Sequence, residues 1–253
     1  MIHVREAQEK DVAGVREIFV ATYGGDYPHP EFFELPLLKK LVFDDETLLL
    51  VAEEEESGRL LGTASVIFDI GAFGDLVGEF GRLAVHPDGR KRGIGKLLMK
   101  ERLKRVGDRL QLAIVENRAC HPYSQRISAE FGFHPVGFLP RKLLFAERES
   151  IALYVKHFGD ALQLRRSHPR VIPEGFTLAE LALRGCGLAP DVIVDDEAAA
   201  YPTETGFQLE TLTAEGYSAL FRLERGRVAH LEVFGPARLV VGLFKIRASH
   251  SNY

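Results

Sequence analysis

The sequence predicts an α/β fold, in which a mixed sheet carries helices on both faces, followed by a smaller strand-rich α+β domain. Two observations predict it. Apolar residues in the first part switch repeatedly between the two-residue period of a strand and the 3.6-residue period of a helix. The last part contains short apolar runs separated by turn residues, which is typical of antiparallel strands. The predicted order in the first part, β-α-α-β-β-β-α-β-α-β-β, is that of a mixed sheet covered on both faces.

The elements of the first part follow from apolar spacing and from helix ends. A short strand is predicted at Ile2–Ala7, and a helix at Asp11–Tyr23, which ends at Gly24. The elements that follow are a helix at Glu31–Phe43, strands at Thr47–Ala52, Leu60–Phe68 and Leu76–Val85, a helix at Gly95–Val106, a strand at Leu110–Val115, a short helix near Tyr123–Phe131 and two strands ending at about Val155.

The pattern weakens around Phe158–Pro173, and we therefore predict two domains, residues 1–158 and 159–253. In the second domain, Thr177–Glu180 is a capping box that predicts a helix start, and Gly185 and Gly187 predict its end. Strands are predicted at Val192–Val194, Phe207–Thr211, Tyr217–Leu223, Val228–Phe234 and Leu239–Ile246, with a hairpin turn at Glu224–Gly226. This domain is expected to cover one end of the first, to shape a cleft or to form a homodimer interface.

Composition excludes several classes of partner. Lys and Arg total 32 against 36 Asp and Glu, so the net charge of −4 gives no global reason to expect nucleic acid or an acidic membrane as partner. Cys120 and Cys186 are too few for a disulfide framework. The carboxylates of Asp195–Glu197 lack the spacing of a calcium loop, so no metal site is predicted. No apolar run is long enough to span a bilayer, and we expect a cytoplasmic protein.

The segment HPDGRKRGIGKLLMK, residues 86–100, combines glycines, cations and a helix start, as phosphate sites do. A nucleoside-triphosphate loop is excluded by spacing, because Arg90 stands where its first glycine belongs and Leu97 where its Mg²⁺-binding hydroxyl belongs. A dinucleotide fingerprint is also disfavoured, because Gly93 and Gly95 have no third glycine at the required place.

The chemistry of this loop suits a pyrophosphate. Glycines at 93 and 95 let backbone amides approach a ligand closely. Those amides are the free donors of the following helix, whose dipole favours anions. Four cations add local positive charge to an acidic protein: Arg90, Lys91, Arg92 and Lys96.

Residues Arg90–Gly95 resemble the Arg/Gln-x-x-Gly-x-Gly/Ala loop of the GNAT acetyltransferase superfamily. The resemblance extends to residues 81–87 and 96–98, and in element order to residues 1–157. It implies the GNAT fold and acetyl-CoA or another acyl-CoA as co-substrate. It also implies an N-acyltransferase acting on an amine of a small molecule or peptide. The cofactor-binding residues that it implies are Leu83, Ala84 and Val85 for the pantetheine arm and Arg90, Lys91, Arg92, Gly93, Ile94, Gly95 and Lys96 for the pyrophosphate.

Deprotonating the acceptor amine requires a base, because a lysine-type amine has a pKa of about 10.4. In the family this base is often a carboxylate on the strand before the loop, where this chain has Glu79. Strand alternation predicts that Glu79 shares a face with Gly81 and Leu83. A purely structural glutamate is an equally good interpretation. His86 is a second candidate, although a His-Pro at a strand end is more often structural.

The usual acid of the family is missing. Alignment on Gly132-Phe133 puts Ser128 where family members carry a tyrosine, and His121 where they carry an asparagine. Two explanations stay open. Either His121, Tyr123 or Ser124 protonates the leaving thiolate, or the chain is an acyl-CoA-binding regulatory or scaffold protein. The candidate catalytic residues are therefore Glu79, His121 and Tyr123.

Overall fold

The computed structural model describes residues 1–68, 76–163 and 173–189, and four strands within residues 207–247. Three sequence features lie outside the described residues: the strand expected at Val192–Val194, the carboxylates of Asp195–Glu197 and the turn expected at Glu224–Gly226. The sheet of the first part has seven strands in the order β1-β2-β3-β4-β5-β7-β6. Its strands are β1 (Ile2–Glu6), β2 (Thr47–Glu54), β3 (Leu60–Ile67), β4 (Val77–Val85), β5 (Leu112–Arg118), β6 (His134–Leu144) and β7 (Arg148–His157).

The sheet is mixed, as predicted. All neighbouring strands are antiparallel except β4 and β5, which run parallel. The β4–β5 ladder is short, since it pairs only residues 77–79 with residues 112–114. Because β4 continues to Val85 and β5 to Arg118, the two strands separate beyond Glu79. Their separation opens the sheet in its middle.

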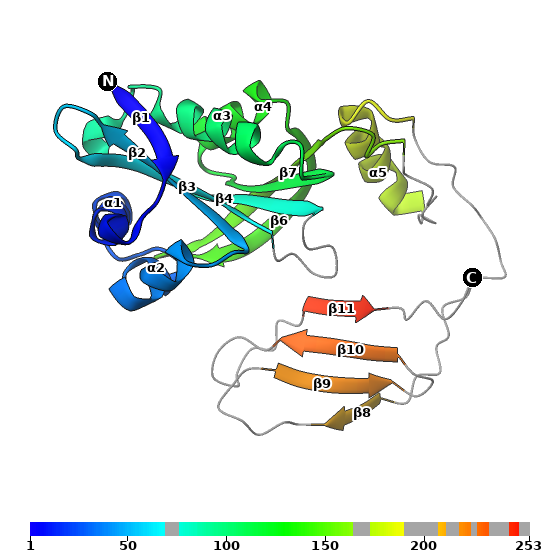
Figure 1. Cartoon of the computed structure of the whole chain (residues 1–253). Helices are drawn as coiled ribbons and strands as arrows, with labels where there is room; N and C mark the ends of the chain where they lie inside the picture. Colours follow the sequence, from blue (N-terminus) through cyan, green and yellow to red (C-terminus); the bar gives the residue numbers. More distant parts are fainter. Residues whose placement is uncertain are drawn as a thin grey trace. The chain divides into compact units, whose positions relative to one another are not determined.

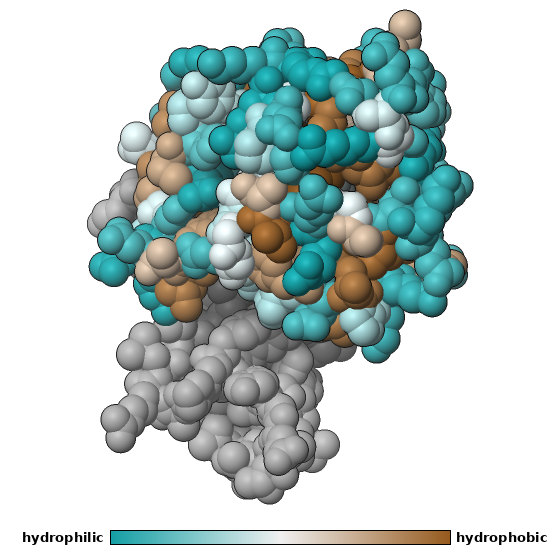
Figure 2. Space-filling model, turned by 90° about the vertical axis from the view of Figure 1, so that its left-hand side faces the viewer, coloured by the Kyte–Doolittle hydropathy of each residue, from teal (hydrophilic) through white to brown (hydrophobic). Residues whose placement is uncertain are grey.

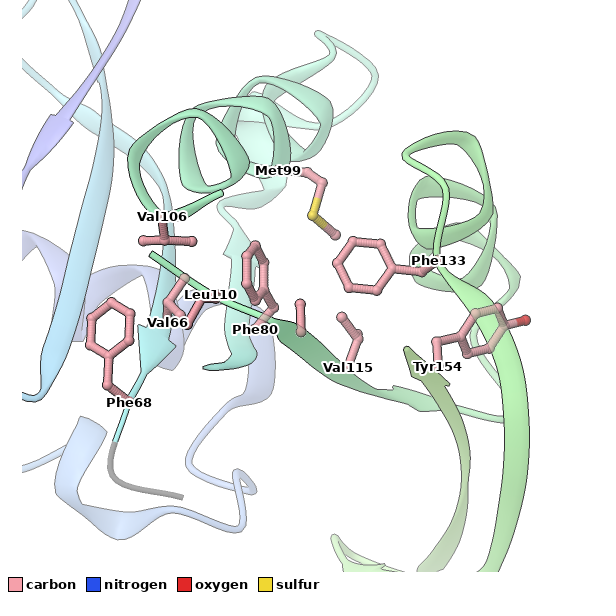
Figure 3. Packing of buried hydrophobic residues seen from close by; sticks show 10 residues of the cluster. Val66, Phe68, Phe80, Met99, Val106, Leu110, Val115, Phe133 and Tyr154 are labelled. Carbon is pink, nitrogen blue, oxygen red and sulfur yellow. The ribbon is translucent and has the colours of Figure 1, made fainter. Parts of the chain in front are cut away.

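Helices lie on both faces of this sheet (Figure 1). The helices are α1 (Val12–Tyr23), α2 (Leu35–Val42), α3 (Ile94–Val106), α4 (Pro122–Glu130) and α5 (Pro173–Gly185), with 3₁₀ turns at Glu9–Asp11, Pro30–Phe32 and Pro87–Gly89. On one face, α1 and α2 bury Val15, Phe19 and Leu38 against the sheet. On the other face, Phe80, Met99 and Phe133 pack together between the sheet, α3 and the end of α4 (Figure 3).

Two predicted helices differ from those observed. The helix expected at Glu31–Phe43 is a 3₁₀ turn followed by α2, because Pro36 is tolerated in the first turn of a helix but not in its interior. The capping box at Thr177 does not start a helix, because α5 already begins at Pro173. The predicted helix end is confirmed, with Gly185 as the last residue and Gly187 at a φ of +75°.

The chain divides into two compact units, Met1–Val194 and Asp195–Tyr253. Helix α5 belongs to the first unit, where it contacts β6. The described strands of the second unit are β8 (Phe207–Glu210), β9 (Ser218–Leu223), β10 (Arg227–Glu232) and β11 (Leu243–Arg247), and they form an antiparallel sheet. The domain boundary expected at residue 158 stays a prediction.

The surface of the first unit is mixed in character. On one face hydrophilic residues predominate, and hydrophobic residues come to the surface in separate patches (Figure 2). Within the described part of the chain, no helix has the length and apolar character needed to cross a membrane.

Candidate active site

A small hollow of about 70 Å³ lies beside the point where β4 and β5 separate. The segment after α1, the two central strands and β6 all contribute to it. Its lining consists of Tyr27, Pro28, His29, Glu79, Gly81, Arg82, Glu116 and Leu143. The predicted base, Glu79, therefore faces an open space.

A β-bulge in β4 shapes this hollow. Thr63 pairs with Ala84 and Ser65 with Gly81, so that Arg82 and Leu83 together stand opposite Ala64. The backbone of Arg82 has a φ of +52°, in the left-handed region that non-glycine residues seldom occupy. The extra residue interrupts the alternation of side chains along the strand.

The bulge corrects one prediction about faces. A Cβ on Gly81 would lie 3.1 Å from Oε1 of Glu79, so these two residues share a face as predicted. Leu83 does not share it. Its side chain packs with Ile94 and Leu98 on the α3 side of the sheet, because the bulge reverses the direction of the side chains that follow.

The carboxylate of Glu79 is held by its neighbour in the bulge. Nη1 of Arg82 donates a hydrogen bond to Oε1 of Glu79 over 2.8 Å. The Arg82 side chain is 12 % exposed and that of Glu79 is 35 % exposed, so the pair is only partly screened by water. The other carboxylate of the lining, Glu116, forms an ion pair with Lys142 of β6.

Aromatic and histidine side chains form the wall opposite β4. The ring of Tyr27 lies 4.7 Å from that of Tyr23 and 4.8 Å from that of Phe19, between ring centroids. Burial raises the pKa of the Tyr27 phenol, so it stays protonated at neutral pH. His29 lies 3.3 Å from Glu31, and this hydrogen bond lowers the pKa of Glu31.

The glycine loop opens α3 as its sequence predicts. Gly93 caps the helix with a φ of +76°, a conformation that glycine adopts without strain. Among the described residues, the amides of Gly93, Ile94 and Gly95 have no hydrogen-bond acceptor, as expected for the first turn of a helix. A Cβ on Gly95 would lie 3.1 Å from Cδ1 of Ile127, so this glycine also allows α3 and α4 to approach closely.

The four cations of the loop are not equivalent. Arg92 forms an ion pair with Glu54 at 2.6 Å, and Lys96 forms one with Glu130 at 2.6 Å. Arg90 and Lys91 are exposed, and no carboxylate of the described residues pairs with them. Their positive charge is therefore the more available for an anionic ligand.

Beyond Glu79, the edge of β4 that faces away from β3 has no strand partner among the described residues. The amide of His86 donates to the carbonyl of Leu61 in β3, over 2.9 Å. Since backbone groups alternate in direction along a strand, Ala84 also faces β3, where Thr63 is its partner. Leu83 and Val85 then direct their backbone groups toward the side from which β5 has separated, and the carbonyl of Val85 also accepts a long hydrogen bond of 3.5 Å from Oγ1 of Thr22. These groups suit a ligand that carries amides.

The two candidate residues near α4 lie together, but away from the lining of the hollow. His121 precedes α4, and its ring centroid lies 5.8 Å from that of Tyr123, which is 66 % exposed. Burial lowers the pKa of His121, and the positive charges of Arg118 and Arg90 lower it further. The imidazole is therefore mostly neutral at pH 7, which suits a proton acceptor better than a donor.

The position of the family tyrosine is filled by a buried hydrogen bond. The Ser128 side chain is 1 % exposed, and its Oγ accepts from Nδ2 of Asn117 over 3.0 Å. His86 has a structural role, because its Nδ1 accepts the amide hydrogen of Asp88 over 3.2 Å. Cys120 donates to Glu149, and burial raises the pKa of its thiol, which opposes a nucleophilic role.

Several residues of the lining were not anticipated from the sequence, among them Tyr27, Arg82 and Glu116. The signal for Arg82 is the break in alternation after Phe80, where an arginine takes the apolar position and Leu83 follows it directly. Tyr27 follows α1 in a segment without periodicity, and its sequence carries no comparable signal. Within residues 1–68, 76–163 and 173–189, no group of three or more His, Cys, Asp or Glu is placed to hold a metal ion.

A family model described as the acetyltransferase (GNAT) family matches residues 12–133. These residues belong to the GNAT acetyltransferase family. The match spans α1 to the end of α4 and includes both the glycine loop and the bulged strand. A comparison with curated proteins found no match.

Solved structures share the GNAT fold with the first part of the chain. The ribosomal-protein-alanine N-acetyltransferase of Brucella melitensis is 20 % identical, with a TM-score of 0.54, over 62 % of this chain and 99 % of that one. Spermidine/spermine N-acetyltransferase SpeG of Vibrio cholerae is 17 % identical, with a TM-score of 0.52, over 64 % and 98 %. NAA60 of Arabidopsis thaliana, in complex with a bisubstrate analogue, is 17 % identical, with a TM-score of 0.52, over 63 % and 99 %. At these identities the likeness establishes the fold.

Proposed function

We propose that the chain is an acyl-CoA-dependent N-acyltransferase that transfers acetyl from acetyl-CoA to a primary amine of a small molecule or peptide. One observation carries the proposal. The left-handed Gly93 opens α3 with amides that have no acceptor among the described residues, next to the unpaired edge of β4. A ligand with a pyrophosphate and an amide-bearing arm matches both features. The GNAT family match, and neighbours named as N-acetyltransferases, support it.

In this proposal the chain binds acetyl-CoA through backbone groups and available cations. The amides of residues 93–95 and the side chains of Arg90 and Lys91 hold the pyrophosphate. Arg92, Ile94 and Lys96 complete the loop around it. Leu83 and Val85 bond the pantetheine arm, while Ala84 keeps β4 in register with β3. When bound, acetyl-CoA supplies a thioester whose carbonyl carbon the amine attacks.

Glu79 acts as the base, directly or through one water. It faces the hollow where the acceptor amine enters, and its ion pair with Arg82 keeps the carboxylate oriented. A neutral amine forms when Glu79 accepts one proton of the ammonium group, and its nitrogen then forms the new C–N bond as the C–S bond breaks. The nitrogen loses its second proton to water. The departing thiolate takes one proton. Tyr123 and His121 are the candidate donors, Tyr123 directly and His121 once protonated.

A second function is favoured by a specific observation. Ser128 at the family tyrosine position is buried against Asn117 and cannot reach a leaving thiolate. The alternative is therefore an acyl-CoA-binding regulatory or scaffold protein without efficient transfer. The absence of nucleic-acid partners, a cytoplasmic location and a homodimer stay predictions.

Two experiments test these functions in turn. In thermal unfolding of the full chain, acetyl-CoA and CoA are expected to raise Tm and ATP is not, because only a ligand of the native state stabilises it. Stabilisation by ATP alone would overturn the cofactor assignment. Thiol release from acetyl-CoA across a panel of amines then separates the two functions. Amine-dependent release identifies a transferase, whereas a rise in Tm without release on any amine identifies a binding protein.

A further inference from the structure

Arg102 is a charged residue in the hydrophobic core. It lies in α3 next to Met99 and Phe80, and it is 1 % exposed. Figure 3 shows the side chains of Phe80 and Met99 in the core between β4 and α3. No carboxylate of the described residues pairs with Arg102, and burial lowers the pKa of its guanidinium to about 9. Burying an unpaired charge is unfavourable, so stability alone would be served better by an apolar side chain.

The contacts of the guanidinium are with backbone carbonyls. Nη1 donates to the carbonyl oxygen of Ser65 at 3.1 Å and to that of Gly81 at 3.3 Å. Nη2 contacts Sδ of Met99 at 3.5 Å, and Cζ lies 5.0 Å from the centre of the Phe80 ring. Nε has no hydrogen-bond partner among the described residues. The two carbonyls are thus the main polar partners of the charge.

These two carbonyls belong to the pair that borders the bulge. Ser65 of β3 and Gly81 of β4 are register partners, and the next pair is Thr63 with Ala84. The guanidinium therefore bridges both strands at the point where the ladder is interrupted. Bulges leave backbone groups without ladder partners, and the two N–H groups of one guanidinium nitrogen, Nη1, serve both acceptors here.

The bulge controls the geometry of the candidate site. Gly81 lies between Glu79 and Arg82, whose side chains form the ion pair of the hollow. The bulge also turns Leu83 toward α3 and precedes the unpaired edge of β4. A shift of the Gly81 carbonyl would therefore move the base, its partner and the edge together.

We infer that Arg102 is a positioning residue, which holds the β4 bulge from inside the core and thereby sets the Glu79–Arg82 pair. The role in catalysis rests on the proposed transferase function, whereas the role in holding the bulge does not. Two separate readouts on the full chain distinguish these claims.

The first readout is amide hydrogen exchange of residues 79–85 without ligand. Arg102→Met replaces a buried charge with an apolar side chain of similar length, so the variant is expected to fold. Exchange in 79–85 should become about tenfold faster, while exchange in β1 and β2 stays unchanged. Val106→Ala is the matched control. It removes buried volume from the same helix and lowers Tm, but leaves exchange in 79–85 relative to the other strands unchanged.

The second readout is kcat per folded molecule in a double-mutant cycle with Glu79→Gln. Arg102→Met should lower kcat by about 10–100-fold, since small displacements of catalytic groups have effects of this size. Glu79→Gln should then cost much less in the Arg102→Met background than in the wild type. If Arg102 has a structural role only, the reductions of kcat in the two single variants should multiply in the double variant.

Unchanged exchange in 79–85 of folded Arg102→Met overturns the inference, whatever the activity. Faster exchange with multiplying losses overturns the catalytic part alone. If the wild-type chain transfers no acetyl group, the proposed function fails and exchange still decides whether Arg102 holds the bulge. Should Arg102→Met not fold, the same readouts are made on Arg102→Leu, which likewise has no donor for the two carbonyls. Faster amide exchange in residues 79–85 of that variant supports the inference, and an unchanged exchange rate overturns it.

Discussion

Nη1 of Arg82 lies 2.8 Å from Oε1 of Glu79, and both side chains line the hollow beside the separated strands β4 and β5. The contact exists because a bulge puts Arg82 at a left-handed φ and turns its side chain to the face of Glu79. An arginine at this distance orients the carboxylate without removing it from the hollow. We therefore propose Glu79 as the carboxylate that takes a proton from the amine.

Replacing Glu79 with glutamine should lower kcat for amine acetylation by about 100-fold, because it removes the proposed general base. The KM for acetyl-CoA should stay near its wild-type value, since Glu79 is not part of the glycine loop. Glu53→Gln is the matched control. Glu53 is also a strand glutamate with an arginine partner, Arg5 at 2.6 Å, but it lies outside the hollow. Equal kcat values for the two variants would contradict the role of Glu79.

Replacing Gly93 with alanine should weaken acetyl-CoA binding about tenfold, because the side chain disfavours the left-handed φ that aims the amides of the loop. Gly24→Ala is the matched control. Gly24 has a φ of +62° at the end of α1, and a Cβ at either glycine would meet nothing within 4 Å. Both variants should lose about 1–2 kcal/mol of stability. Calorimetric titration with acetyl-CoA should distinguish the two variants. Equal affinities for acetyl-CoA would contradict the role of the glycine loop in binding it.

Replacing Ser128 with alanine should lower the free energy of unfolding by about 1–3 kcal/mol, because the buried amide of Asn117 loses its acceptor. kcat per folded molecule should not change, since the hydroxyl is enclosed. The exposed Ser57→Ala serves as control and should change stability by about 0.5 kcal/mol or less. A large fall in kcat for Ser128→Ala at unchanged stability would instead identify Ser128 as the acid.

Acid should weaken the fold through the buried Asp11. Burial by itself raises the pKa of this carboxyl, but hydrogen bonds from the Arg5 side chain and the Gln8 amide outweigh it and lower the pKa below 3.8. A lowered pKa contributes stability above the unfolded-state value, and this stability is lost as pH falls through the folded-state pKa. Asp11→Asn should therefore have a lower Tm than the wild type at pH 7. The gap should narrow below about pH 4, and a constant gap would contradict this account.

The sequence predicted the strands and helices of the first part well, because their apolar periodicity reflects burial on a sheet face or helix face. It also identified the loop at Gly93, since a left-handed turn before a helix requires a glycine. The start of the helix expected at 31–43 was wrong, because Pro36 limits where α2 begins. Local sequence therefore predicted most elements, and this proline explains that misplaced helix start.

The candidate site was less predictable, because its geometry depends on one inserted residue. Alternation placed Leu83 beside Glu79, but the bulge at Arg82 reversed it. Arg102 and Ser128 lie in helices, but their hydrogen-bond partners lie in strands far away in the sequence. Spacing within one segment does not reveal such partners. Arg102 does carry a signal, since it occupies an apolar helix position between Met99 and Val106. The long-range hydrogen bonds that fix the site follow from packing.

Amine-dependent thiol release from acetyl-CoA by the purified full chain tests whether this GNAT domain transfers an acetyl group to an amine. We expect release that saturates with at least one primary amine and falls about 100-fold in Glu79→Gln, whereas Glu53→Gln should retain the wild-type release. The contradicting result is acetyl-CoA binding with no amine-dependent release on any acceptor of the panel.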